Sequence, residues 1–231
     1  MSNQPQSQAP QSVVIAGASG VVGARVLHHL LEHPGVGRVT AIGRRQLQQK
    51  HPKLVSTVAD LSSASSIGRV TPDDVTIAFC CLGTTMKAAG SKEAFRAVDY
   101  GAVTAFAQAM HDKRARRFVL LTSAGASTKS SNFYLRTKGE AEDAVESMGF
   151  DGFVAVRPSF LDDEGGRKEQ RTGEQLALPV ARALFSIIGK THRWAPISVD
   201  VVGRAMVRLG FDTTTDKRRV VESDTLHAIG A

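Results

Sequence analysis

The stretch Val13–Gly23, Val-Val-Ile-Ala-Gly-Ala-Ser-Gly-Val-Val-Gly, decides the fold. Its first residues, Val13–Ile15, are apolar and β-branched, which predicts a buried parallel strand. Three glycines follow, and an apolar pattern at helical spacing begins directly behind them. Strand, glycine turn and helix in this order are the context that a dinucleotide-binding fingerprint requires. On this stretch alone, a glycine-rich turn without a ligand remains the alternative.

The three glycines have different expected roles. Gly17 permits a turn that a Cβ would block. Gly20 lets backbone N–H groups approach a pyrophosphate, and Gly23 lets the helix pack closely on the strand. The helix N-terminus would then face the phosphates with its partial positive charge. Because the spacing G-x-x-G-x-x-G is looser than G-x-G-x-x-G, the glycine turn alone does not establish a dinucleotide site. The rest of the chain has to decide between such a site and a turn without a ligand.

The composition is that of one globular domain. With 231 residues and 42% hydrophobic content, the chain can bury a sizeable core, so we expect a single α/β domain over residues 12–231. Residues 1–11 are polar and predict a disordered tail, and no apolar run approaches the length of a membrane span. The only two cysteines, Cys80 and Cys81, are adjacent and make neither a disulfide framework nor a metal site. We therefore expect a reducing, cytoplasmic location.

The net charge of +7 raises the question of a nucleic-acid partner. Basic residues concentrate at Lys113–Arg117 and Lys217–Arg219, but no aromatic residues interleave with them to stack on bases. We favour a solvated helix end and a solvated loop, and we do not expect a nucleic-acid partner. The expected state is a monomer or a homodimer. The histidines His28, His29 and His33 lack metal-site spacing, so we expect no metal.

The remaining patterns predict a doubly wound parallel sheet with helices on both faces and a small C-terminal substrate-side region. Further strands are expected at 38–42, 54–59, 75–82, 118–121 and 153–156, with a final one at 220–221. Helices are expected at 62–67, 91–110, from about 130 to Met148, 176–188 and 199–209. The charged stretch Asp162–Glu174 predicts a mobile lid, within substrate-side segments near 160–195.

The end of the second strand predicts the cofactor type. An NAD-preferring site would carry an Asp or Glu there to hold the ribose 2′-hydroxyl, but none stands between Gly35 and Lys50. Arg44 and Arg45 stand there instead, and guanidinium groups match a phosphate by bidentate hydrogen bonds. The sequence therefore favours NADP.

Two further strand ends face the same crevice. Asp60 and Leu61 follow the third strand and could flank an adenine ring, although Asp60 could equally cap a helix. Gly83, Thr84 and Thr85 follow the fourth strand. In a doubly wound sheet that strand lies beside the first at the topological switch point, so these residues should face the glycine turn.

Tyr134 and Lys138 carry the expected chemistry. They are four residues apart on one predicted helix and share a face. A lysine ammonium beside a phenol lowers the phenol pKa and makes the tyrosine a usable general acid or base. Ser123, at the end of the fifth strand, could hydrogen-bond the carbonyl oxygen that Tyr134 protonates, and Lys138 could also hold the nicotinamide ribose.

At this point the chain resembles the short-chain dehydrogenases/reductases, and more narrowly the atypical subgroup that includes the Tat-interacting protein. The resemblance rests on Gly-Ala-Ser-Gly-Val-Val-Gly (17–23), Cys-Leu-Gly-Thr-Thr (81–85), Ser-Asn-Phe-Tyr-Leu-Arg-Thr-Lys-Gly-Glu (131–140) and Arg-Pro-Ser (157–159). It implies a Rossmann fold, NADP(H) binding and a Ser123–Tyr134–Lys138 triad, with Ser127 as a rival serine.

We therefore expect an NADP-dependent oxidoreductase acting on a carbonyl or alcohol of a small-molecule substrate. The alternative is an NADPH-binding regulatory or interaction protein with little or no turnover, because the subgroup includes such proteins. The expected cofactor-binding residues are Gly17, Ser19, Gly20, Val21, Val22, Gly23, Arg44, Arg45, Asp60, Leu61, Cys81, Leu82, Gly83, Thr84, Thr85, Tyr134, Lys138 and Pro158.

Overall fold

A seven-stranded parallel sheet forms the middle layer of the molecule. The computed structural model describes residues 9–163, 194–212 and 216–231. The strand order is β3-β2-β1-β4-β5-β6-β9, and every neighbouring pair is parallel. The strands are β1 (Gln11–Ala16), β2 (Val36–Gly43), β3 (Leu54–Val58), β4 (Val75–Cys80), β5 (Arg117–Leu121), β6 (Gly152–Arg157) and β9 (Arg218–Glu222).

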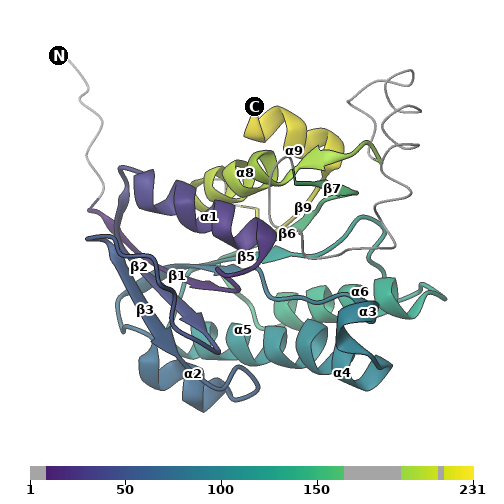
Figure 1. Cartoon of the computed structure of the whole chain (residues 1–231), viewed down its shortest axis with the longest axis horizontal. Coiled ribbons are helices and arrows are strands. Elements are labelled where there is room, and N and C mark those ends of the chain that lie inside the picture. The colour runs from purple at the N-terminus through teal and green to yellow at the C-terminus, as the bar shows by residue number, and fades with distance from the viewer. Residues whose placement is uncertain (1–8, 164–193, 213–215) are drawn as a thin grey trace.

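Helices cover both faces of the sheet, which confirms the predicted doubly wound α/β fold (Figure 1). One face carries α1 (Val21–Glu32), α8 (Val199–Phe211) and α9 (Ser223–Gly230). The other face carries α2 (Ala64–Val70), α5 (Val103–Asp112) and α6 (Phe133–Glu146). Two short helices, α3 (Met86–Ala89) and α4 (Lys92–Arg96), lie between β4 and α5 in the chain.

The sequence of β1 explains why both faces are covered. Val13 and Ile15 belong to the core under α1 and α8, whereas Val14 and Ala16 belong to the core under α2, α5 and α6. Successive side chains of a strand point to opposite faces, so a segment buried on both faces is apolar at successive positions, as Val13–Ala16 are. All four residues have no exposed surface.

The strand order places the switch point between β1 and β4. From β1 the chain crosses to β2 and β3 on one side, and from β4 it continues to β5 and β6 on the other. The register pairs Ile15 with Phe79 and Ala16 with Cys80, so both strands end at the same level. Ligands of open α/β sheets bind outside the carboxyl ends of the strands at such a point.

The predicted helix over Ser91–Met110 has an unexpected interruption. It consists of α4, a π-helical segment at Ala97–Ala102 and then α5. A π-helical turn holds an extra residue and so rotates the side chains that follow relative to those before it; such turns occur often at functional sites. The sequence did not indicate the π-helical segment, because the apolar residues around it keep a continuous helical spacing.

Other boundaries differ in smaller ways. β4 ends at Cys80 and not at Leu82, α2 begins at Ala64 behind the N-cap Ser63, and β1 begins at Gln11, the last residue of the expected tail. The sequence did not predict α3, α9, β7 (Leu161–Asp162) or β8 (Ile197–Ser198).

Two expected segments fall mainly outside the described residues. These are the predicted lid beyond Asp163 and the predicted helix over 176–188; residues 1–8 of the expected tail also lie outside. Within the part of the chain that the structure describes, no helix combines the length and the apolar character needed to cross a bilayer.

Candidate active site

The glycine turn after β1 is built against the end of β4. Gly17 has φ +84°, and a Cβ added to it would lie 2.4 Å from the carbonyl oxygen of Cys81. A Cβ on Gly23 would lie 2.1 Å from the carbonyl oxygen of Gly17. Only glycine fits at either position, which agrees with the expected roles of the first and third glycines. The turn therefore places residues 17 and 81 in direct contact.

The N-terminus of α1 is open to an anion. Its N-cap, Gly20, offers no capping side chain, and the first turn contains no acidic residue. Ser19, Gly20 and Val21 are exposed, whereas Val22 is buried under the helix. Backbone N–H groups in the first turn have no partner within a helix. A phosphate at this point would satisfy them and complement the helix dipole.

Arg44 and Arg45 lie directly behind the end of β2 and are exposed. Among the described residues, no hydrogen bond or ion pair engages either guanidinium. The N–H of Ala59 donates to the carbonyl of Gly43 at 3.1 Å, so the loop after β3 lies beside the two arginines. Both side chains are thus free to meet a ligand at this edge.

Asp60 and Leu61 lie in that neighbouring loop. The Asp60 carboxylate accepts hydrogen bonds from the backbone and hydroxyl of Ser62, at 2.9 and 2.7 Å. These bonds lower the pKa of Asp60. The cap of α2 is Ser63, so the alternative of Asp60 as that helix cap is wrong, and Asp60 instead stabilises the turn before it. Leu61 is largely buried.

The loop after β4 brings a buried acid to the site. The backbone N–H of Thr84 donates to Asp99 Oδ2 at 2.9 Å. A Cβ on Gly83 would lie 3.2 Å from Asp99 Oδ1 and 3.3 Å from Lys138 Nζ. Cys81 and Leu82 are nearly buried, and the Thr85 hydroxyl caps α3 by accepting from Ala88. Gly83 thus lies directly over an ion pair.

That ion pair joins Asp99 to Lys138. Lys138 Nζ lies 2.7 Å from Asp99 Oδ1, and the two side chains are 7% and 0% exposed. Burial alone would lower the pKa of Lys138, but the Asp99 carboxylate, and to a lesser extent Tyr134, raise it above its ordinary value. The buried Asp99 carboxylate therefore favours the charged form of Lys138.

Tyr134 lies one helical turn before Lys138 on α6. Its ring packs against Phe95 of α4, with centroids 5.3 Å apart, and Phe95 is fully buried. The ring is thus fixed by packing, while the described residues give its hydroxyl no hydrogen-bond partner. Tyr134 has the position expected of a general acid beside a charged lysine.

The structure separates the two candidate serines. The Ser127 hydroxyl accepts from the backbone of Lys129 at 3.2 Å, and a Cβ on Gly139 would lie 2.4 Å from the Ser127 carbonyl carbon. Ser127 therefore supports a turn that packs on α6. Among the described residues, the Ser123 hydroxyl has a single long contact, a donation at 3.4 Å to the carbonyl of Ala124. Its freedom favours Ser123 as the residue that meets a ligand.

Pro158 supports the loop that carries Ser123. The carbonyl of Pro158 accepts from the N–H of Ala124 at 2.9 Å, so the ends of β5 and β6 are joined directly above the sheet. Pro158 itself is buried.

The sequence analysis missed Asp99. The signal was present, because Asp99 lies four residues after the buried Phe95 and four before the buried Val103, on the core-facing side of an apolar helix pattern. A charged residue at a core position is rarely buried without a partner. The core position of Asp99 would therefore have predicted a buried partner for its carboxylate, although it would not have identified that partner.

Glu142 is a second missed residue. It is fully buried and lies one turn after Lys138 on α6. Its carboxylate accepts from the Thr122 hydroxyl at 2.6 Å and from Arg157 at 2.5 and 3.0 Å. Hydrogen bonds to Glu142 raise the pKa of Arg157 despite partial burial. Glu142 thus ties α6 to the ends of β5 and β6, next to Ser123 and Pro158.

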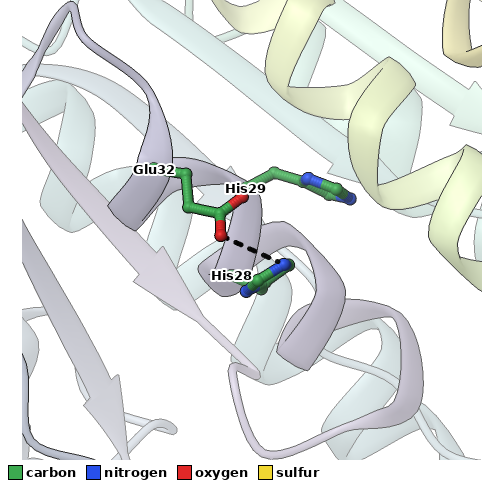
Figure 2. A group of neighbouring side chains, drawn as sticks. All are labelled: His28, His29 and Glu32. Atoms are coloured by element: carbon green, nitrogen blue, oxygen red, sulfur yellow. Dashed lines mark ion pairs between the residues drawn. The ribbon is translucent and has the colours of Figure 1, made fainter.

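Figure 2 shows His28, His29 and Glu32, whose ligand atoms lie within 4.8 Å of one another. His28 pairs with Glu32 at 3.5 Å, and His29 Nε2 lies 3.0 Å from Asp200 Oδ1. Each of the three side chains therefore has a partner in the protein, and His28 and Glu32 are more than half exposed. We assign no metal to this group.

Three basic residues of the two runs form ion pairs within the protein. Lys113 forms an ion pair with Asp73, Arg218 with Glu146, and Arg219 with Asp212. Such pairs leave less free positive charge than the sequence count indicates. The expectation that nucleic acid is not a partner stays a prediction.

Comparison with known proteins agrees with this geometry. A family model described as NAD(P)H-binding matches residues 17–183. The protein fmp52, mitochondrial, of Emericella nidulans is 36% identical over 210 residues, which cover 86% of this chain and 87% of that protein. The FMP52 protein of Kluyveromyces lactis is 29% identical over 218 residues, covering 93% and 96% of the two chains.

Solved structures share the fold at low identity. A short-chain dehydrogenase/reductase family oxidoreductase from Burkholderia thailandensis has a TM-score of 0.68 at 18% identity, covering 96% of this chain and 94% of that one. MoeE5 in complex with UDP-glucuronic acid and NAD has a TM-score of 0.69 at 16% identity, covering 95% and 81%.

The names of the relatives correct one expectation. Relatives from Emericella nidulans, Aspergillus terreus and Aspergillus niger are all named mitochondrial, so the expected cytoplasmic location is wrong. The cysteine usage behind that expectation reports only a reducing environment. It does not distinguish one reducing compartment from another.

Proposed function

Because the chain belongs to the NAD(P)H-binding family, we propose that it is an NADPH-dependent oxidoreductase that interconverts a carbonyl and an alcohol. One observation carries the proposal: Tyr134 lies beside a buried, charged Lys138, which in turn lies under the β4 loop facing the glycine turn. A protein that only holds a nucleotide needs the lysine but has no use for the tyrosine.

The residues present fit a dinucleotide. The Gly17 and Gly23 positions form a cradle that a Cβ would fill, and the uncapped N-terminus of α1 offers unpaired N–H groups to a pyrophosphate. Arg44 and Arg45 would hold the 2′-phosphate, and Lys138 would hold the nicotinamide ribose. When bound, the cofactor supplies or accepts the hydride.

In the reduction direction, Tyr134 donates its hydroxyl proton to the carbonyl oxygen of the substrate. The adjacent Lys138 ammonium stabilises the phenolate that remains. Ser123 donates a hydrogen bond to the same carbonyl oxygen and orients it. The proton on the tyrosine is then restored from solvent.

A screen of carbonyl compounds and metabolite extracts for NADPH oxidation tests this proposal, with the Tyr134→Phe variant as the blank. We expect oxidation by the wild-type protein that the variant loses. Cofactor binding without any oxidation that depends on Tyr134 would contradict the enzyme. It would favour the alternative, a cofactor-binding regulatory protein. One observation supports this alternative: the negative charge of Asp99 lies beside Lys138 and offsets the positive charge that acts on Tyr134.

The choice of NADPH rests on Arg44 and Arg45. Charge-assisted contacts to a 2′-phosphate should make NADPH bind more tightly than NADH by about 1.5–3 kcal/mol. The Arg44→Ala/Arg45→Ala variant should lose this preference and keep its affinity for NADH. Fluorescence titration with both cofactors measures it, and equal affinities in the wild-type protein would overturn the assignment.

A further inference from the structure

Asp99 is a fully buried carboxylate that the proposed reaction does not use. It lies in the π-helical segment Ala97–Ala102, and both of its oxygens are engaged at the site. Oδ1 lies 2.7 Å from Lys138 Nζ, and Oδ2 accepts from the Thr84 N–H at 2.9 Å. One side chain thus joins the lysine of α6 to the loop after β4.

We propose that Asp99 is a positioning residue of the cofactor site, which holds Lys138 Nζ in place and keeps it protonated. The inference rests on the proposed function, because it assigns Lys138 to the nicotinamide ribose. Without a counter-ion, a lysine as buried as Lys138 would lose its charge, since burial disfavours the ammonium form. A neutral lysine could still occupy the site but would neither hold the ribose as firmly nor stabilise the Tyr134 phenolate.

The local geometry explains why the carboxylate must come from this segment. The π-helical segment lies next to α6 and to the end of β4. Gly83 leaves the space above the ion pair open, because a Cβ there would lie within 3.3 Å of both charged groups. Among the described residues, Gly83 lies against the pair on the side of the β4 loop. On this proposal a ligand reaches the Lys138 ammonium past this glycine, while Asp99 holds the lysine from within the fold.

The Asp99→Asn variant separates the charge from the packing. Asparagine has the same shape and keeps an oxygen that can accept from Thr84, but it removes the negative charge beside Lys138. The Asp112→Asn variant is the matched control, because Asp112 is an exposed residue of the adjoining helix α5 that interacts with Gln108. It should behave as the wild-type protein.

The first measurement uses the protein without cofactor. Lysine labelled with ¹³C at Cε reports the charge of each lysine by NMR, and the Lys138→Met variant identifies the Lys138 signal. We expect the Lys138 pKa to fall by about two units or more in Asp99→Asn. An equal Lys138 pKa in the Asp99→Asn variant and the wild-type protein would overturn the proposal.

The second measurement is NADPH affinity between pH 7 and pH 9.5. The ratio of the Asp99→Asn to the wild-type dissociation constant should rise about ten-fold across this range, as the lysine of the variant loses its proton. In a Lys138→Met background, Asp99→Asn should change the affinity less than about two-fold, because no lysine remains to position. A ratio constant with pH, or full additivity of the two substitutions, would show that Asp99 has only a structural role.

Folding and cofactor binding are controlled separately. If Asp99→Asn does not fold, Asp99→Asn/Lys138→Met should fold, because it leaves no unpaired buried charge. A double variant that also fails to fold contradicts the proposal. If the wild-type protein binds neither NADPH nor NADH, the proposed function fails, whereas the Lys138 titration still decides whether Asp99 sets its charge.

Discussion

At the residue scale, Tyr134 and Lys138 share a helix face but differ in what surrounds them. The Tyr134 ring packs on Phe95 and its hydroxyl has no partner among the described residues, whereas Lys138 is buried against Asp99. Their substitutions should therefore have different effects. Tyr134→Phe removes one hydroxyl and should leave NADPH affinity within a few-fold, while turnover falls by about 10²–10⁴.

Lys138→Met should affect both quantities, because it removes the ribose contact and the cation beside the phenol. NADPH titration and steady-state kinetics on the best substrate from the screen measure the two effects. A Tyr134→Phe variant as active as the wild-type protein would leave no role for the tyrosine as the acid.

Gly17 gives a second prediction at this scale. Its φ of +84° and the 2.4 Å approach to the Cys81 carbonyl leave no room for a side chain. The left-handed backbone alone costs an alanine about 1–2 kcal/mol, and the steric clash adds to this. We expect Gly17→Ala to lower the free energy of unfolding by at least that amount and to weaken cofactor binding.

Gly68 is the matched control for this substitution. It lies inside α2, and a Cβ there would meet nothing within 4 Å. Gly68→Ala should therefore stabilise the protein by about 0.5–1 kcal/mol, since alanine is the better helix former. Urea unfolding of both variants tests the pair, and equal effects of the two substitutions would contradict the assigned role of Gly17.

At the element scale, α6 carries the reactive residues, and Glu142 fixes it to the sheet. The Glu142 carboxylate binds Thr122 at the end of β5 and Arg157 at the end of β6. Removing one partner of a buried ion pair leaves the other uncompensated, which costs about 3–5 kcal/mol. Glu142→Ala should lose this much in urea unfolding, whereas Glu146→Ala, which removes an exposed ion pair with Arg218, should lose about 1 kcal/mol or less. Similar losses in the two variants would mean that Glu142 is not the anchor of α6.

The elements also show what the sequence could predict. The strands in the middle of the sheet were predictable because a segment buried on both faces is apolar at successive positions, as Val13–Ala16 of β1 are. The π-helical segment was not, because one extra residue in a turn leaves the apolar spacing of a helix nearly unchanged. For the same reason the sequence did not predict the Asp99–Lys138 contact, because that contact depends on where the π-helical segment directs the Asp99 carboxylate. The glycine turn and the Tyr134–Lys138 pair are local in sequence and were predictable for that reason.

At the scale of the whole molecule, the expected cofactor site lies across the switch point of the sheet. Its residues come from the end of β1 and β2 on one side and from β4, β5 and α6 on the other. A ligand bound across this line contacts both halves and binds only the folded chain. Cofactor binding should therefore stabilise the entire protein and not one part of it.

This gives a prediction that needs no substrate. At a hundred-fold excess over its dissociation constant, a ligand adds about 2.7 kcal/mol to the free energy of unfolding. In a protein of this size that corresponds to a rise in Tm of about 5–10 °C. At equal concentrations NADPH should raise the Tm more than NADH, because of Arg44 and Arg45. The Arg44→Ala/Arg45→Ala variant should respond equally to both cofactors. Calorimetry measures these shifts in a single unfolding transition. An unchanged Tm with millimolar NADPH and NADH would mean that no cofactor bridges the two halves of the sheet.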